Sequence, residues 1–473
     1  MVKRTETPYS FLEIKNNNLI QFEDYNYKGV YIYKQLPLSI TPSLTLETSK
    51  SLSETVKDKD ITGKVIPSIK IDRLFIADGG WYTICLPFSL TEAVFCGKLL
   101  IKDRRKERSD MKIRNELLSQ VRSYAGHTPH AAEDTLDCSL GVNPYGFPPV
   151  VKEAFAAFDP ERFYHYPHSD APQKAIVDYW ADYAFIEPEN IVLTDGSVSA
   201  LYLLCNILAK KGAEVVGFLP TFTDMVEYSR MMAMRYVGIP ARREENWRME
   251  VSDLVDAISG DTSLVYIDRP NNPTGQTLSL ADISRVLDRC EELGVYAIVD
   301  EAYGDFLPRE ESAVTLGPKY KNIIIVRTFS KGFGLAGLRA GYIITGQELI
   351  RYISKVSNPY MMSELSRELA AAALSDRTYA DSHGPDFAAM KQALRGVCGK
   401  ELTMAVTDDR VPICLLQHRN PRADLQELLM AEGVLTCSGG EFEPLDRSSV
   451  RLRVPRAEEL DKLLRAVEKV NNG

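Results

Sequence analysis

The chain has 473 residues, of which 45% are hydrophobic and 26% charged, as in an ordinary soluble globular protein. This length allows two or three domains. The net charge of −9 gives no electrostatic reason to expect a nucleic-acid partner. No run of about 18 apolar residues occurs, so we expect neither a membrane span nor a membrane partner.

The eight cysteines are scattered along the chain without a C-x-x-C pair. This spacing argues against a disulfide framework or a zinc site and favours the reducing cytoplasm. The histidines form no ligand-spaced cluster, since His127 and His130 have no cysteine or acidic residue to complete a site. We therefore expect a cytoplasmic protein without a bound metal.

The first 110 residues differ in composition from the rest. They contain only two alanines, Ala77 and Ala93. Residues 29–33 and 81–85 have the composition of strands, and the Ser/Thr/Lys-rich residues 39–59 are typical of loop or disorder. No chemical motif occurs here. Our hypothesis is that residues 1–110 are an N-terminal extension of unknown role and that the catalytic module begins naturally at Met111, where a helical pattern opens.

Beyond residue 111, strand and helix patterns alternate regularly. Apolar, β-branched runs predict strands at 191–194, 214–219, 235–239, 263–268, 295–299, 323–327 and 341–345. Helical patterns lie between and beside them, at 150–158, 171–184, 198–210, 222–233, 251–258, 279–293 and 347–356. This alternation predicts an α/β fold with a mostly parallel, seven-stranded sheet covered by helices.

Residues 357–360, Ser-Asn-Pro-Tyr, interrupt the pattern. The segment after them predicts a smaller α+β domain: a helix, then strand 411–416, helix 423–431, strand 450–454 and helix 457–470. We therefore divide the catalytic module into an N-terminal arm (111–160), a large domain (161–357) and a C-terminal small domain (358–473).

The strand at 323–327 leads into Thr-Phe-Ser-Lys (328–331) and a glycine-rich turn. Gly332, Gly334 and Gly337 match the G-x-G-x-x-G pattern of dinucleotide-binding proteins, but that pattern requires a helix to begin at the glycines. Here a strand begins at 341 instead. What remains is Lys331 at the end of a buried strand, among glycines that allow a ligand to approach closely.

Polar residues follow four of the predicted strands, at the edge where ligands bind in open parallel sheets. Ser197 begins a helix, where free N–H groups favour a phosphate. Asn272 lies in an Asn-Asn-Pro-Thr-Gly turn, Asp300 ends a strand, and Lys331 and Arg339 follow another. Each feature alone is ordinary, as a helix cap or a turn. Together they fit one ligand with a phosphate, an aldehyde and a ring nitrogen.

Pyridoxal phosphate is such a ligand. Lys331 would bond covalently to its aldehyde, and Asp300 would keep the ring nitrogen protonated so that the ring accepts electrons. The other polar residues would hold the phosphate (Ser197, Ser330 and Arg339, whose guanidinium matches a phosphate) and the ring hydroxyl (Asn272 and Tyr303).

The chain from about 111 to 470 resembles the fold-type I pyridoxal-phosphate aminotransferases of class I/II. The matching motifs are Asn-Asn-Pro-Thr-Gly at 271–275, Asp-Glu-Ala-Tyr at 300–303, and Ser-Lys at 330–331 followed by Arg339. Within that family, the branch of histidinol-phosphate aminotransferase and threonine-phosphate decarboxylase is the most similar, through residues 138–146, 164–167 and 336–339.

This resemblance implies further roles. Phe222 would stack on the cofactor ring. Tyr166 would reach the cofactor phosphate of a neighbouring subunit, which implies a homodimer with shared active sites. Arg451 would bind the anionic group of the substrate. Four more residues would lie at the cofactor (Val198 and Thr328) and at the substrate (Asn143 and Tyr145).

The sequence departs from that branch at one point. Residues 434–440 contain no arginine, whereas the branch carries a second arginine shortly before the strand of Arg451. A doubly charged phosphate substrate would lose one of its two cationic partners. This departure argues against histidinol phosphate and threonine phosphate and favours an amino acid with one carboxylate.

We predict an aminotransferase that moves an amino group between an amino acid, or an amino-alcohol phosphate, and a 2-oxo acid. Lys331 would remove the substrate's α-proton as general base, with Asp300 and Tyr303 as the other catalytic residues. One alternative is a pyridoxal-phosphate-dependent decarboxylase, because the same ring serves both reactions. Another is a pyridoxal-phosphate-binding regulator with residues 1–110 as its effector or interaction domain.

Overall fold

The computed structural model describes residues 134–473, residues 115–117 and seven strands nearer the N-terminus. The chain divides into two compact units, residues 1–113 and 114–473. In the first unit, β1 (Leu12–Lys15), β2 (Asn18–Gln21) and β3 (Lys34–Pro37) form an antiparallel sheet. A second antiparallel sheet has the order β4-β7-β6-β5, with β4 (Leu44–Thr48), β5 (Arg73–Ala77), β6 (Trp81–Leu86) and β7 (Phe95–Ile101).

These strands bear on the predictions for the first 110 residues. Strand β6 confirms the strand predicted at 81–85. Strand β4 lies within residues 39–59, so the prediction of loop or disorder is wrong for its five residues. The rest of that range, the strand predicted at 29–33 and Met111 lie outside the described residues. A short 3-10 helix covers Asn115–Leu117. The role of this unit and the start at Met111 stay predictions.

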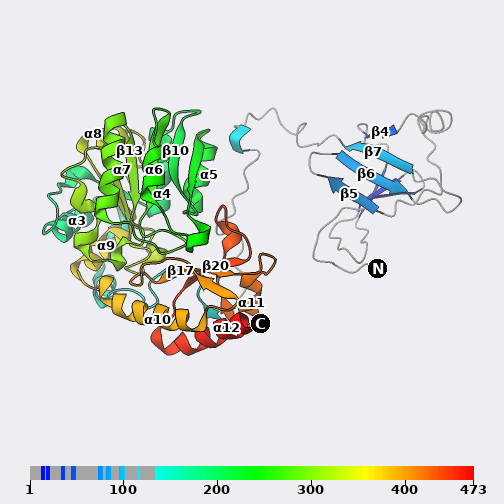
Figure 1. Ribbon diagram of the computed structural model, residues 1–473. Coiled ribbons are helices and arrows are strands. Elements are labelled where there is room, and N and C mark those ends of the chain that lie inside the picture. Colours follow the sequence, from blue (N-terminus) through cyan, green and yellow to red (C-terminus); the bar gives the residue numbers. More distant parts are fainter. Residues whose placement is uncertain are drawn as a thin grey trace. The chain divides into compact units, whose positions relative to one another are not determined.

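A seven-stranded sheet forms the centre of the second unit (Figure 1). Its strands, in order across the sheet, are β11 (Arg235–Pro240), β10 (Glu214–Leu219), β12 (Thr262–Asp268), β13 (Tyr296–Asp300), β14 (Ile323–Thr328), β15 (Gly341–Thr345) and β9 (Ile191–Thr194). All neighbours are parallel except β15, which is antiparallel to both β14 and β9. The predicted α/β fold is confirmed, and the boundaries of all seven strands agree with the predictions within one residue.

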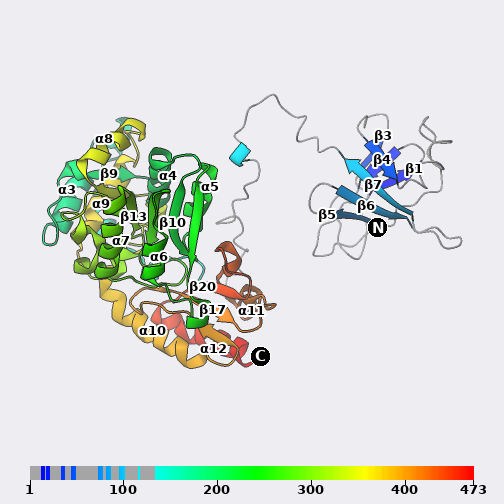
Figure 2. The same cartoon turned by 45° about the horizontal axis from the view of Figure 1, so that its top comes forward.

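Helices cover both faces of this sheet (Figure 2). One face packs against α4 (Ser197–Leu208), α5 (Thr223–Met231) and α8 (Gln347–Val356). The other packs against α3 (Ala171–Trp180), α6 (Val251–Ala257) and α7 (Leu280–Leu293). Helix α9 (Glu364–Ser375) packs against α3, and α2 (Pro149–Ala157) packs against α9. No helix among the described residues is long and apolar enough to cross a membrane.

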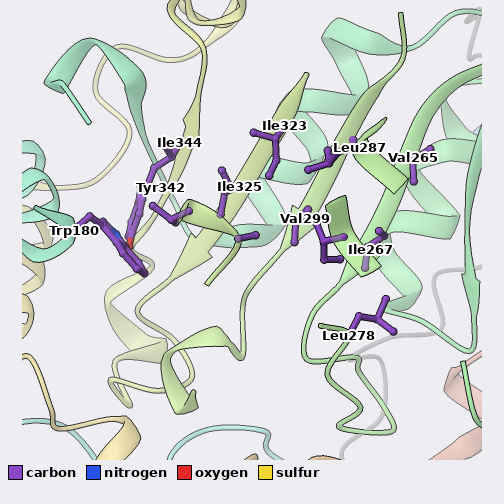
Figure 3. Close-up of a cluster of buried hydrophobic side chains, with 14 of the residues drawn as sticks. Trp180, Val265, Ile267, Leu278, Leu287, Val299, Ile323, Ile325, Tyr342 and Ile344 are labelled. Atoms are coloured by element: carbon purple, nitrogen blue, oxygen red, sulfur yellow. The ribbon is translucent and has the colours of Figure 1, made fainter. Parts of the chain in front are cut away.

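Side chains of each strand alternate between the two faces, because successive residues of a strand point to opposite sides. On β12, Leu264 and Tyr266 belong to the core under α4 and α5, whereas Val265 and Ile267 belong to the core of the other face. Figure 3 shows this second core, with Leu287 of α7. Full burial of one such side chain contributes about 1.5–3 kcal/mol to the free energy of unfolding. The same alternation extends to the polar residues at the strand ends, so that residues on one face of the sheet lie close together and those on the other face lie apart from them.

The C-terminal part forms a second layer of helices on a small sheet, coloured orange and red in Figure 1. The sheet is antiparallel, with β16 (Leu402–Met404), β17 (Ile413–His418), β20 (Ser449–Arg453) and β19 (Cys437–Ser438) in that order. Helices α10 (Gly384–Val397), α11 (Leu425–Ala431) and α12 (Leu460–Asn472) share its core. Strand β8 (Leu136–Asp137) pairs with β18 (Val434–Leu435), which ties the N-terminal arm to this part.

Three features of the catalytic part differ from the sequence predictions. The helix predicted at 171–184 ends at Trp180 and is followed by a turn over residues 181–183. One helix predicted after residue 361 is two, α9 and α10, and Pro385 lies in the first turn of α10, where proline is tolerated. Strands β8, β16, β18 and β19 were not predicted, because two or three residues carry too little alternation.

Candidate active site

A cavity lies at the carboxyl ends of the parallel strands and at the N-terminus of α4. Nine residues singled out in the sequence line it: Ser197, Val198, Phe222, Asn272, Asp300, Tyr303, Ser330, Lys331 and Arg339. Asp268, Pro270, Ala302 and Ala336 complete the lining. The structure thus brings together residues that lie up to 142 positions apart in the sequence, from Ser197 to Arg339.

Lys331 reaches this cavity from the turn that follows β14. The backbone of the turn is held by Asn143, whose N–H donates to the Lys331 carbonyl (3.0 Å) and whose Nδ2 donates to the Gly332 carbonyl (2.9 Å). Burial, with the positive charges of Arg451 and Arg339, lowers the pKa of Lys331 to about 8. Its neutral amine, the form that attacks an aldehyde, is therefore better populated near neutral pH than that of an ordinary lysine.

Asp300 ends β13 and is buried at the floor of the cavity. The Tyr266 hydroxyl donates to its Oδ2 (3.0 Å) and the Ala302 N–H to its Oδ1 (3.0 Å). Asp268 lies opposite in the register of β12 and β13. Burial and the nearby Asp268 raise the pKa of Asp300 to about 7, and burial raises the pKa of Asp268 to about 6. Within residues 134–473 no salt bridge joins either carboxylate to a cation.

The N-terminus of α4 and Arg339 form a cradle for an anion. Helix α4 begins at Ser197, after Gly196 at φ +90°. A Cβ on Gly196 would lie 2.6 Å from Arg339 Nη2, so only glycine lets the guanidinium approach so closely. Arg339 Nη2 donates to the Asp195 carbonyl (3.1 Å) and Nη1 to Ser330 Oγ (3.4 Å). These groups, with the free N–H groups of the helix start, suit a phosphate.

Arg451, predicted at the substrate, lies behind the lining. Its Nη1 donates to Asn272 Oδ1 (3.0 Å), and Asn272 itself lines the cavity. Its Nη2 donates to the Ser139 carbonyl (2.7 Å). In the register of the small sheet Arg451 pairs with Cys437, a buried thiol. Of residues 434–440, which contain no arginine, Cys437 and Ser438 therefore form the strand that pairs with the strand of Arg451.

Four other predicted residues stand outside the lining. The hydroxyl of Thr328 donates to Ser330 Oγ (2.9 Å), so Thr328 positions a lining residue. Tyr166 is 69% exposed, and its ring stacks on that of Tyr360 with centroids 4.4 Å apart. Tyr145 stacks on the ring of His383. Asn143, described above, supports the lysine turn instead of lining the cavity. The roles predicted for all these residues stay predictions.

Asp268, and a buried row of charges one residue further along the strands, were not predicted from the sequence. Arg269 Nη1 donates to Glu301 Oε1 (3.0 Å), and Arg327 Nη1 donates to Glu301 Oε2 (2.6 Å). Arg327 also pairs with Asp305 and lies over the Trp180 ring, 5.0 Å from its centroid. All four charged side chains are at most 3% exposed. The signal for Asp268 was available, because it ends a strand just as Asp300 does.

These features fit pyridoxal phosphate. The paired carboxylates Asp268 and Asp300 need a positive charge, which a protonated ring nitrogen supplies. The Gly196–Arg339 approach leaves a cradle for the phosphate. The depressed pKa of Lys331 suits covalent attachment of an aldehyde.

Comparisons with known proteins give the family. Residues 133–467 match the family model described as aminotransferase class I and II. The chain is 30% identical over 327 residues to a histidinol-phosphate aminotransferase of Dehalococcoides mccartyi, covering 69% of this chain and 87% of the relative. Over 340 residues it is 25% identical to that of Methanocaldococcus jannaschii, covering 72% of this chain and 90% of the relative.

A solved structure agrees in fold. Histidinol-phosphate aminotransferase of Sinorhizobium meliloti, in complex with pyridoxal 5'-phosphate, has a TM-score of 0.63 at 21% identity, covering 77% of this chain and 99% of that one. The matched residues span the whole seven-stranded sheet, the small sheet and most of α12. The chain therefore belongs to the class I and II aminotransferases and is a pyridoxal-phosphate-dependent enzyme.

Proposed function

We propose that the chain transfers the amino group of an amino acid with one carboxylate to a 2-oxo acid, and that Lys331, Asp300 and Tyr303 are its catalytic residues. The observation that carries this proposal is the meeting of three groups in one cavity: an amine of depressed pKa, a buried carboxylate and an anion cradle. When bound, the cofactor supplies an aldehyde that takes up the amino group and a ring that accepts the electron pair released at the substrate's α-carbon.

The residues of the chain divide the remaining work. The neutral amine of Lys331 would take the α-proton as a general base and, as a general acid, would return it to the carbon that the cofactor's aldehyde supplies. The carboxylate of Asp300 holds the proton on the ring nitrogen. Three sets of residues hold the rest of the cofactor: Ser197, Val198, Ser330 and Arg339 at the phosphate, Asn272 and Tyr303 at the ring hydroxyl, and Phe222 on the ring face.

The substrate class rests on the surroundings of Arg451. Its guanidinium matches one carboxylate, and its neighbour in the small sheet is Cys437, a neutral thiol whose pKa burial raises to about 11. The curated relatives described above are named for histidinol phosphate. We propose that this chain prefers ordinary amino acids, because a phosphate dianion would find no second arginine in residues 434–440. Measured kcat/KM values for a set of amino acids and for histidinol phosphate decide between an ordinary amino acid and a phosphate substrate.

We also propose a homodimer in the cytoplasm, in which Tyr166 reaches the partner's cofactor phosphate. Exposed aromatic side chains near this residue support an interface: Phe155, Phe163, Tyr164 and Tyr166 are 58–86% exposed. The six cysteines of residues 134–473 are all free, which suits a reducing compartment. Sedimentation equilibrium should give twice the mass of the chain, and a monomeric mass at micromolar concentration would exclude the shared site.

The experiment that tests the function is Lys331→Ala. The wild type should transfer amino groups to a 2-oxo acid without releasing carbon dioxide, and borohydride reduction should leave the cofactor on a peptide that contains Lys331. We expect the variant to lose roughly 10²–10⁴-fold or more in turnover, because both the covalent anchor and the base are removed. It should still bind the cofactor through the cradle. Normal turnover by Lys331→Ala, or carbon dioxide release by the wild type, would overturn the proposal.

A further inference from the structure

Asp268 has a position in the cavity that the proposed roles leave unused. It ends β12, is 5% exposed and lines the cavity beside Asp300, its partner in the strand register. Both residues follow the face of the sheet on which Tyr266 lies. The titratable groups that face Asp268 are Asp300 on β13, Tyr266 on β12 and Tyr236 on β11. All three are acidic groups, so none of them neutralises its charge.

The carboxylate of Asp268 also ties two cofactor-holding loops together. Its Oδ1 accepts hydrogen bonds from Thr221 Oγ1 (2.9 Å) and Asn271 Nδ2 (2.9 Å), and its Oδ2 accepts one from the Asn272 N–H (2.8 Å). Thr221 directly precedes Phe222, the proposed stacking ring, and Asn272 is the proposed partner of the ring hydroxyl. One buried side chain therefore joins the loop after β10 to the loop after β12.

We propose that Asp268 is a second carboxylate for the cofactor ring: it positions Phe222 and Asn272, and its negative charge, beside that of Asp300, selects a ring that carries a protonated nitrogen. This inference rests on the proposed function, since it requires the ring to lie over Asp300. Two buried carboxylates on adjacent strands repel each other, and a single positive charge between or beside them relieves the repulsion. A ring that cannot be protonated offers no such relief.

The test separates charge from positioning by comparing two ligands. Full-length wild type, Asp268→Asn and Thr221→Val are titrated with pyridoxal phosphate and with its deaza analogue, in which a C–H replaces the ring nitrogen. Wild type should prefer pyridoxal phosphate. Asp268→Asn keeps the volume but loses the charge, so the preference should fall about 3- to 10-fold. Thr221→Val removes one hydrogen bond to Asp268 without changing the charge of Asp268, and should weaken the binding of both ligands equally.

Each outcome decides a different point. An unchanged preference in Asp268→Asn, with both ligands weakened as in Thr221→Val, would reduce Asp268 to an anchor and overturn the inference. A wild type that binds neither ligand would overturn the proposed function instead. If Asp268→Asn does not fold, Asp268→Ser, which is smaller and retains a hydroxyl, takes its place. Absorbance of the bound cofactor between pH 5 and 8 gives a second readout, because the loss of the carboxylate should lower the pKa of the ring nitrogen.

Discussion

Two groups of buried charges lie one residue apart at the ends of β12 and β13, the second group extending to β14, and they differ in how their charges are compensated. Asp268 and Asp300 follow the face covered by α4 and α5 and line the cavity. Arg269, Glu301 and Arg327 follow the other face, where Arg327 lies against Trp180 of α3. The second group is joined by salt bridges from end to end. The first has none within the described part of the chain.

The comparison shows where a ligand's charge is needed. Removing a charge from water is expensive, and the cost is recovered only when a partner is present. For Glu301 the arginines on either side are that partner, and its pKa is lowered in spite of burial. Asp300 has the same burial but an acidic neighbour, and its pKa is raised to about 7. On the function proposed above, the partner of Asp300 is supplied from outside the chain, by a bound ring.

The largest effect should come from breaking the paired row. Arg327→Met leaves Glu301 with one cation and Asp305 with none among the salt bridges described above. Breaking a buried pair from one side costs about 3–5 kcal/mol, because an uncompensated charge stays buried. Urea unfolding should show this loss in the free energy of unfolding.

The matched control for Arg327→Met lies on the surface. Arg395 pairs with Asp409, and their side chains are 40% and 39% exposed. Arg395→Met should cost less than about 1 kcal/mol, since exposed pairs contribute little. Equal losses of unfolding free energy in the two variants would mean that the buried salt bridges stabilise the protein no more than an exposed pair does.

Asp268 and Asp300, which form no salt bridge within residues 134–473, should make the free energy of unfolding depend on pH. In the cofactor-free protein the pKa of Asp300 is about 7, against 3.8 for an ordinary aspartate. Because the folded pKa is the higher one, the contribution of Asp300 to stability is complete below about pH 4 and is lost as the pH rises through 7. Asp300→Asn has no such loss.

Between pH 5 and pH 8 the free energy of unfolding of the wild type should therefore fall by on the order of 2 kcal/mol more than that of Asp300→Asn. Cofactor-free proteins unfolded in urea at both pH values give this difference. Glu301→Gln is the control, because Glu301, with its lowered pKa, is ionised in both states over this window. Parallel pH curves for wild type and Asp300→Asn would show that Asp300 has a counter-charge within the chain.

The two groups of charges also differ in how well the sequence predicts them. Strands such as 323–327 are long, β-branched runs, so the sheet and the edge that carries Lys331 and Asp300 were predictable from periodicity. The row of Arg269, Glu301 and Arg327 was not, because each residue alone looks like a charge at a strand end. Only the register of β12, β13 and β14 shows that these residues form one row.

The substrate side was harder still to predict. Arg451 reaches Asn272 only because the small sheet packs against the loop after β12, a contact between residues 179 positions apart. Short strands such as β19, which places Cys437 beside Arg451, carry almost no periodic signal. Motifs therefore predict the proposed cofactor site, whereas the surroundings of Arg451 depend on tertiary packing that single-sequence patterns do not encode.

The smallest expected change with pH comes from Tyr266→Phe, which removes one donor from Asp300. The lost hydrogen bond (3.0 Å) goes to a buried, charged acceptor at pH 8, so the free energy of unfolding should fall by about 1.5–3 kcal/mol there. At pH 5 Asp300 is protonated, and the loss should shrink to about 0.5–1.5 kcal/mol. The control is Tyr320→Phe, whose hydroxyl donates to Asp288 (2.7 Å), a carboxylate with a 58% exposed side chain. Water replaces that donor at either pH, so the loss should be small and independent of pH. If Tyr266→Phe behaved like this control, the charge of Asp300 would be solvated, and the contrast between the two groups of charges would disappear.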